Sequence, residues 1–540
     1  MKTIKPSLAW LLAFTAAFAV LAGFVFWGTW SCDVTPIMPD CPTVHPVGYF
    51  AALSKCLGER CLETWQFVPD DLTVFIGTPY FRQELQYAFG AYFAALALAY
   101  YCRGRGLSRA ASYSAALLLG FCGYWFSLFS AGHLGWFLLM IYCVFAFGLA
   151  DRAVRKGKLK NWLLLGAVVA WGCRRQQDLW MVFTFFAAAY FVWCCVRERK
   201  WPDLKGVACA ALAFFVIGGA NIRSAFTEAL AGRERQLEES KGSALSGGEG
   251  KSDEEAKWIF VTNWSMPPED TLEFFVPRVH GDTSCPLSLS LAAARHADLK
   301  PYTGRLGRPL GAPEGNYRQH SLYVGWVTCL LALVAIAGAV RNRRDIPSDL
   351  VFFAGAALFF WLLSMGRYCE FVYRGVFQVP LINSLRAPVK WHHATELSLC
   401  VLAACGVEAL WRAPWVKARR WARWAVLGFV LLGAFDLARV NHIYCVPVDL
   451  RAVRRQDCNM DLTILREADL RHPQVAAMVR ARQIIPLANY AGRRDVWLVE
   501  YLTPRKPPEK KPGPPPLAKG LGIVSLLGTL AVAAYGIKKS

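Results

Sequence analysis

Side chains suited to proton transfer and phosphate binding gather in short polar segments between long apolar runs of this chain. Carboxylates come first, and the candidate catalytic residues among them are Asp33, Asp70, Asp71 and Glu84. The cations lie in later segments, and the candidate ligands for a phosphate group are Arg174, Arg175, Arg367, Arg386 and Lys390. Further pocket candidates in the same segments are His133, Asp178 and His392.

The two kinds of side chain have complementary uses. A carboxylate takes a proton from an attacking hydroxyl group. Guanidinium groups hold a phosphate and neutralise the charge that develops as it leaves. This combination suits sugar transfer from a lipid phosphate. Each residue also has an explanation without catalysis: Asp33 could be a solvated helix cap, and an external arginine could contact lipid headgroups. The prediction therefore depends on all of these residues lying on one face of the membrane protein.

Composition indicates the class of protein. The 540 residues are 55% hydrophobic and 18% charged, whereas a soluble chain carries about 25% charged residues. Several uncharged apolar runs approach the roughly 20 residues that a helix needs to cross a bilayer. Long continuous runs also exclude a membrane β-barrel, whose strands alternate in hydrophobicity. We therefore expect an all-α polytopic membrane protein.

About twelve transmembrane helices are predicted. The expected spans are 8–26, 86–102, 110–130, 133–150, 161–173, 178–196, 206–222, 321–340, 350–366, 392–411, 422–440 and 520–537. A cleaved signal peptide is the alternative for the first run, but its apolar core is longer than usual and no clear cleavage site follows, so an uncleaved helix is favoured.

The polar segments alternate in character and predict the topology. Short loops dense in Lys and Arg, such as "DRAVRKGKLKN", alternate with longer mixed loops. By the positive-inside rule the basic loops are cytoplasmic, which places both termini in the cytoplasm and the protein in the inner (plasma) membrane. Much of the +21 net charge follows from this topology, so no nucleic-acid partner is predicted.

The topology divides the chain into a transmembrane core and a C-terminal part. The core covers 1–440, with a first external loop at about 29–85 and a large external loop at about 223–320. A small extracytoplasmic region (441–503), a proline-rich linker (504–519) and a C-terminal anchor helix (520–540) follow. Pro267 to Val276 predicts a short helix in the membrane interface, with Glu269 and Asp270 favouring its N-terminal dipole.

Two long motifs resemble a known family. "NWSMPPEDTLEFFVPRVHG" (263–281) and "LLSMGRYCEFVYRGVFQVPLINSLRAPVKWHHATELSLCVLAACGVEAL" (362–410) resemble segments of the YfhO-like bacterial membrane proteins, and "SAGHLGWF" looks like the short histidine turn of that family. The resemblance implies a GT-C type fold and a polyprenyl-phosphate sugar donor. It also implies a catalytic acid soon after the first helix, which is Asp33 here.

The predicted function is therefore glycosyl transfer from a polyprenyl-phosphate-linked sugar to an envelope glycan, lipid or protein, with membrane lipids as the surroundings. No cofactor and no metal ligand are assigned, since no clear DxD motif requires a divalent ion. Two other classes stay open: a transporter or flippase of lipid-linked sugars, and a non-catalytic envelope scaffold.

Reporter fusions test the orientation. A reporter fused after Ser252 is expected to be extracytoplasmic and one after Lys158 cytoplasmic, because Lys and Arg concentrate in the alternate loops. Alkaline phosphatase and green fluorescent protein activities would report the two locations. The reverse pattern would overturn the orientation and the site that depends on it.

Overall fold

The structure is a computed structural model of the chain. It describes residues 6–27, 34–36, 83–131, 133–173, 177–219, 253–281, 302–305, 321–341, 348–379, 383, 385–445, 447–449, 462–466, 484–489, 496–501, 524–525 and 527–532.

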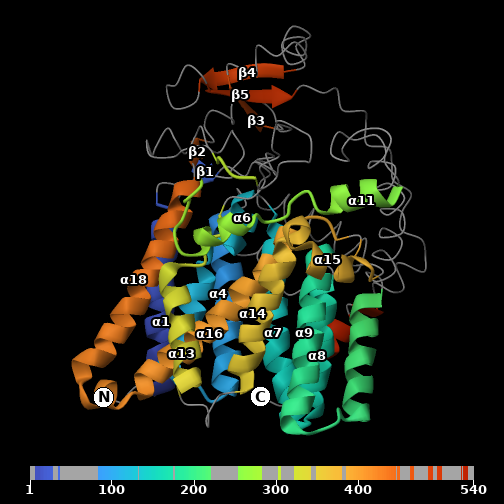
Figure 1. Ribbon diagram of the computed structural model, residues 1–540, viewed down its shortest axis with the longest axis vertical. Coiled ribbons are helices and arrows are strands. Elements are labelled where there is room, and N and C mark those ends of the chain that lie inside the picture. Colours follow the sequence, from blue (N-terminus) through green and yellow to red (C-terminus); the bar gives the residue numbers. More distant parts are fainter. Residues whose placement is uncertain are drawn as a thin grey trace.

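Most helices form a bundle, which stands upright in Figure 1. They are α1 (Pro6–Val25), α4 (Gln83–Gly104), α5 (Arg109–Gly120), α6 (Gly123–Ala131), α7 (Leu134–Lys156), α8 (Leu159–Cys173), α9 (Gln177–Glu198), Leu204–Gly219, α13 (Trp326–Arg341), α14 (Ser348–Ser364), α16 (His392–Arg412) and α18 (Arg420–Tyr444). Shorter helices are α11 (Asp253–Val261), η4 (Pro268–Phe274), η6 (Gly366–Cys369), α15 (Glu370–Phe377), η8 (Pro388–Trp391) and α17 (Pro414–Ala418).

The helices agree with a polytopic α-helical membrane protein. Among the described residues, 5 helices are long and apolar enough to cross a membrane, or up to 7 if each of two bent pairs is one span. Helices occupy every predicted span range up to 422–440, although α8, Leu204–Gly219 and α13 are shorter apolar helices. The number of twelve spans and the GT-C arrangement stay predictions.

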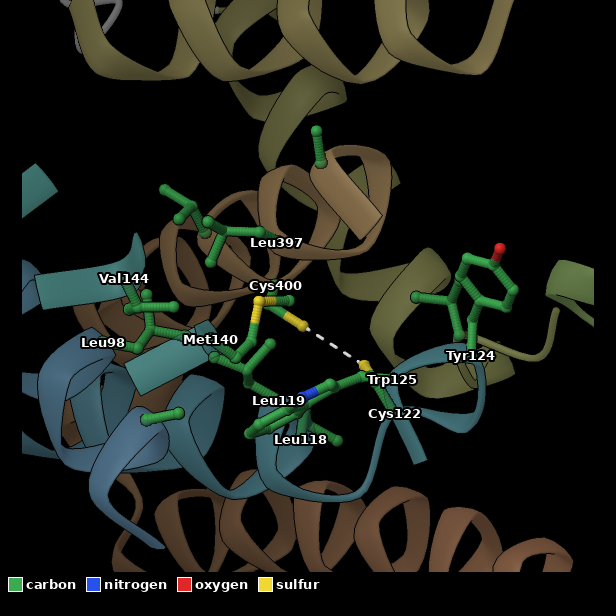
Figure 2. Close-up of a cluster of buried hydrophobic side chains, with 14 of the residues drawn as sticks. Leu98, Leu118, Leu119, Cys122, Tyr124, Trp125, Met140, Val144, Leu397 and Cys400 are labelled. Atoms are coloured by element: carbon green, nitrogen blue, oxygen red, sulfur yellow. Dashed lines mark hydrogen bonds between the residues drawn. The ribbon is translucent and has the colours of Figure 1, made fainter. Parts of the chain in front are cut away.

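Helix α16 packs against α13, α14 and α5. Its small residues permit a close approach: an added Cβ at Gly406 would lie 2.0 Å from the carbonyl oxygen of Leu331 on α13. Close packing without voids stabilises such a bundle. Figure 2 shows Leu397 and Cys400 of α16 in a cluster of buried side chains that also contains Leu98, Leu118, Leu119, Met140 and Val144.

A buried carboxylate ties the break between α5 and α6 to α16. Glu396 is fully buried, and its Oε1 accepts the backbone N–H groups of Tyr124 (3.0 Å) and Trp125 (3.4 Å). The first N–H groups of a helix have no partner within it, so Glu396 satisfies two of them at the start of α6. The N–H of Gly123 donates to the carbonyl of Tyr323 at 2.9 Å. The two helices bend by 40° at this junction.

The two kinds of predicted loop lie at opposite ends of the bundle. In Figure 1, α11 and α15 lie at the upper end, whereas the connections from α9 to Leu204–Gly219 and from α16 to α18 lie at the lower end. The predicted alternation of mixed and basic loops therefore agrees with the helix directions. Which end faces the cytoplasm stays a prediction.

Short strands add to the helices. β1 (Val34–Pro36) pairs with β2 (Pro447–Asp449), and this joins the segments that follow α1 and α18. In a second antiparallel sheet, β5 (Val496–Tyr501) lies between β3 (Leu462–Arg466) and β4 (Ile484–Asn489). This sheet lies above the bundle in Figure 1. The region 441–503 thus contains β-structure, which the predicted all-α class leaves out.

The last described helical residues lie against α8 and Leu204–Gly219. The hydroxyl of Ser525 donates to the carbonyl of Ile217, and the indole N–H of Trp171 donates to the Thr529 hydroxyl at 3.3 Å. The predicted anchor is therefore in contact with the bundle. The linker 504–519 lies outside the described residues.

An ion-pair network joins α4, α7, α9 and α14 at the lower end of the bundle. Asp151 of α7 is 1% exposed and accepts from Arg105 (3.2 Å) and Arg197 (2.7 Å), with Arg155 at 2.5 Å. Asp349 of α14 contacts Arg105 and Arg197 as well. Each buried acid thus has cationic partners, which is the condition under which charge is tolerated inside a protein.

Removing the shared acid tests this network. We expect Asp151→Ala to lower the free energy of unfolding by about 3–5 kcal/mol, because the arginines lose a buried counter-ion. Glu370→Ala is the control, since it removes an exposed Glu370–Arg374 pair worth about 1 kcal/mol or less. Titration with a denaturing detergent measures both, and equal losses would contradict the assignment.

Candidate functional site

The segments that carry the long motifs lie against one another at the upper end of the bundle. We name residues 258–281, 302–305, 364–369 and 385–391 the motif layer. Residues 261–266 bond to both neighbouring segments. Backbone N–H to carbonyl bonds join Met266 to Ser364 (2.8 Å), Ala387 to Val261 (3.0 Å) and Val389 to Trp264 (3.0 Å), and the N–H of Arg367 donates to the Ser265 hydroxyl (3.0 Å).

Gly366 is needed for this close approach. Its φ is +48°, and an added Cβ would lie 2.2 Å from the hydroxyl oxygen of Ser265 and 2.6 Å from Cγ of Pro388. Glycine alone accepts such a conformation and such a contact without strain. Ala387 has φ 66°, which is strained for a residue with a Cβ. Strain of this kind concentrates at functional sites.

Two of the predicted phosphate ligands lie within the motif layer. The guanidinium of Arg386 lies 4.1 Å from the ring centre of Trp264 and 4.5 Å from that of Phe260, a cation–π arrangement. Nη2 of Arg367 donates to the carbonyl of Asn263 at 2.6 Å. The partners of these two guanidinium groups thus include aromatic rings and a backbone carbonyl group.

Lys390 and His133 meet at one tryptophan. Nζ of Lys390 lies 4.4 Å from the ring centre of Trp136, and the His133 ring stacks on the same indole at 4.7 Å and 16°. The short histidine turn before α7 is therefore in contact with the motif layer. Trp136 was not predicted as a site residue, although it lies within the "SAGHLGWF" motif.

His392 lies in the protein interior beneath the motif layer. Its ring is fully buried between Phe274 (4.3 Å) and Tyr124 (5.1 Å), and Nε2 lies 3.3 Å from the carbonyl of Leu322. His393 stacks on the same Tyr124 ring at 4.2 Å. The predicted pocket residue is thus part of a buried ring cluster that joins η4 to the bundle.

The motif layer also contains an acidic pair that was predicted only to favour a helix dipole. Tyr302 donates its hydroxyl to Oδ2 of Asp270 at 2.6 Å, and Arg305 forms two bonds of 2.8 Å with Glu269. Burial raises the pKa of Asp270 to about 6, and the Tyr302 bond opposes that shift. A signal in the sequence was present, because two adjacent acids follow two prolines in the motif.

The predicted interfacial helix differs in form from the structure. Pro268–Phe274 is a 3₁₀ helix, and Phe274 is buried on His392 instead of facing the interface. Leu272 (57%), Phe275 (40%) and Val276 (52%) are exposed, as expected for an interfacial surface. Phe274 is thus separated from the exposed apolar residues of this segment, because the tighter 3₁₀ turn distributes side chains differently from an α-helix.

Other predicted residues are not placed. Those that lie outside the described residues are Asp33, Asp70, Asp71, Arg174 and Arg175. Glu84 and Asp178 lie in α4 and α9, and their side chains are outside the described part. The predicted meeting of these carboxylates with the cations therefore stays a prediction.

The chain matches no protein-family model, no curated protein and no solved structure. The resemblance to YfhO-like proteins therefore stays a prediction based on motifs. Among the residues that the structure describes, no group of three or more His, Cys, Asp or Glu side chains is placed to hold a metal ion.

The pKa of Asp270 predicts a pH dependence of stability. Because its pKa is raised by folding, its contribution is complete below about pH 4 and is lost as the pH rises through about 6. We expect Asp270→Asn, which keeps the Tyr302 bond without a charge, to gain on the order of 3 kcal/mol over the wild type between about pH 4 and pH 8. Denaturing-detergent titrations at both pH values measure this, and parallel pH slopes would contradict it.

Proposed function

We propose that this chain is an integral-membrane glycosyltransferase. It transfers a sugar from a polyprenyl-phosphate donor to a cell-envelope acceptor on the extracytoplasmic face. The observation that supports this most is the motif layer, where backbone hydrogen bonds join the segments that carry Arg367, Arg386 and Lys390. These cations lie at one end of an apolar bundle, where the phosphate of a lipid-linked donor would be found.

In this proposal the cations hold the donor phosphate and neutralise the charge that it gains as the sugar leaves. Arg386 and Lys390 each lie over an indole ring, so the aromatic groups fix the cation and exclude water around it. Shielding from water strengthens a cation–phosphate contact. The polyprenyl tail stays in the bilayer beside the apolar bundle.

A flippase of lipid-linked sugars is the second candidate. One observation favours it: α14 and Gly366–Phe377 form a helix pair bent by 113°. Discontinuous helices of this kind line the substrate sites of many transporters. A transporter would move the donor across the membrane without breaking the sugar–phosphate bond, so the two candidates differ in product.

Substitution of Arg386 tests the donor-phosphate site. We expect Arg386→Gln to raise the apparent KM for the donor roughly 10- to 100-fold, because it removes a charge-assisted contact made in the ground state. Arg412→Gln is the control, since Arg412 is an exposed arginine at the end of α16, paired with Glu408 and away from the motif layer. The assay uses purified protein, a polyprenyl-phosphate sugar and envelope acceptors.

An unchanged apparent KM for Arg386→Gln would show that Arg386 does not bind the donor phosphate. If the wild type transfers no sugar from any donor but moves the donor across the membrane of liposomes, the flippase would be the correct function and the glycosyltransferase would not.

A further inference from the structure

Asp270 and His280 face each other within the motif layer. Oδ1 of Asp270 lies 4.0 Å from Nε2 of His280, whose side chain is 27% exposed. Asp270 itself is fully buried, and Oδ1 accepts no hydrogen bond within the described part of the chain. Oδ2 accepts from the Tyr302 hydroxyl at 2.6 Å. Tyr302, Asp270 and His280 therefore form a series that runs from the interior to the protein surface.

Residues 302 and 303 hold both members of this pair. The side chain of Tyr302 holds Asp270, and Thr303 donates its N–H (2.9 Å) and its hydroxyl (3.2 Å) to the carbonyl of His280. Tyr302 therefore holds the carboxylate of Asp270, and Thr303 holds the backbone of His280. A proton-transfer group needs such positioning, because its efficiency depends on geometry first.

The neighbours of His280 also select its tautomer. Nε2 lies 3.2 Å from the carbonyl oxygen of Glu269 and faces the Asp270 carboxylate. Both groups are acceptors, so Nε2 carries the hydrogen and Nδ1 is left as the basic nitrogen. The same carboxylate stabilises the imidazolium that forms when Nδ1 takes a proton.

We propose that His280 is the proton acceptor of the transfer reaction and that Asp270 and Tyr302 are its positioning residues. This inference rests on the proposed function and deepens it, because the acceptor must then be a compound with a free hydroxyl group.

The proposed reaction is a displacement at the anomeric carbon of the donor sugar. The acceptor hydroxyl oxygen forms a bond to the anomeric carbon of the donor sugar, and its proton passes to Nδ1 of His280. The bond from that carbon to the donor phosphate oxygen breaks, and its electron pair leaves with the phosphate. Arg367, Arg386 and Lys390 neutralise the phosphate, and the imidazolium later returns its proton to water.

The charges that face the pair are compatible with this role. Glu269 and Arg305 neutralise each other through two 2.8 Å bonds. Arg278 precedes His280 by two residues in the same segment. Desolvation raises the pKa of Asp270 to about 6, so the carboxylate is ionised at neutral pH, when it is needed to pair with the imidazolium.

Kinetics of His280→Gln test the proton acceptor. The amide cannot take a proton, so kcat should fall about 10²- to 10⁴-fold while the apparent KM for the donor stays unchanged. His442→Gln is the matched control: His442 is a part-buried histidine of α18 whose Nδ1 lies 2.8 Å from the carbonyl of Val25, and it belongs to another set of contacts. It should retain full kcat.

Asp270→Asn tests the positioning role by comparing its effects on kcat, on KM and on stability. We expect a lower kcat with an unchanged apparent KM for the donor, because the imidazolium that forms in the reaction loses the carboxylate that faces it at 4.0 Å. A purely structural role would lower kcat only together with stability, whereas this variant is expected to be slower although it is more stable than the wild type at pH 8. The unfolding measurement described above shows whether the variant is folded.

The outcomes separate this inference from the proposed function. Normal kcat in His280→Gln, or normal kcat in Asp270→Asn, overturns the inference while the transferase stands. Loss of transfer in Asp33→Asn with normal transfer in His280→Gln assigns the proton acceptor to Asp33. No transfer by the wild type overturns both proposals.

Discussion

The upper end of this protein depends on the hydrogen bonds that residues 261–266 make with the segments on either side of them. These bonds bring together the motif at 263–281 and two parts of the motif at 362–410; Ser265 and Arg367, for example, are separated by 102 positions. They require backbone contact that Gly366 permits, because any side chain there would collide with Ser265 and Pro388. The positions of Arg367, Arg386 and Lys390 follow from this contact.

The placement of charge follows a second constraint, which is that polar groups inside an apolar bundle must be bonded. At the lower end, acids and arginines from four helices neutralise one another around Asp151 and Asp349. In the interior, Glu396 bonds to the N–H groups that begin α6. At the upper end, Arg386 and Lys390 lie over indole rings. Aromatic rings thus accompany these cations at the upper end, whereas carboxylates accompany the arginines at the lower one.

The candidate site was predictable in part. Arg367, Arg386, Lys390 and His133 were selected from the sequence because ionisable groups beside apolar spans are costly, and the structure places them in or against one layer. Asp270 and His280 were missed as site residues. Their partners, Tyr302 and Thr303, lie 32 and 23 positions further along the chain, across a segment without a periodic pattern. No local spacing rule connects residues at such distances.

The class of protein, the ranges of the long helices and the separation of basic from mixed loops could be predicted from the residues alone. Each of these depends on hydropathy or charge summed over neighbouring residues, and such sums are local. The tertiary structure decided that η4 is a 3₁₀ helix with Phe274 turned inward, that His392 is buried, and that Asp270 faces His280. These features depend on which segments pack together, and packing is settled by contacts between residues far apart in the chain.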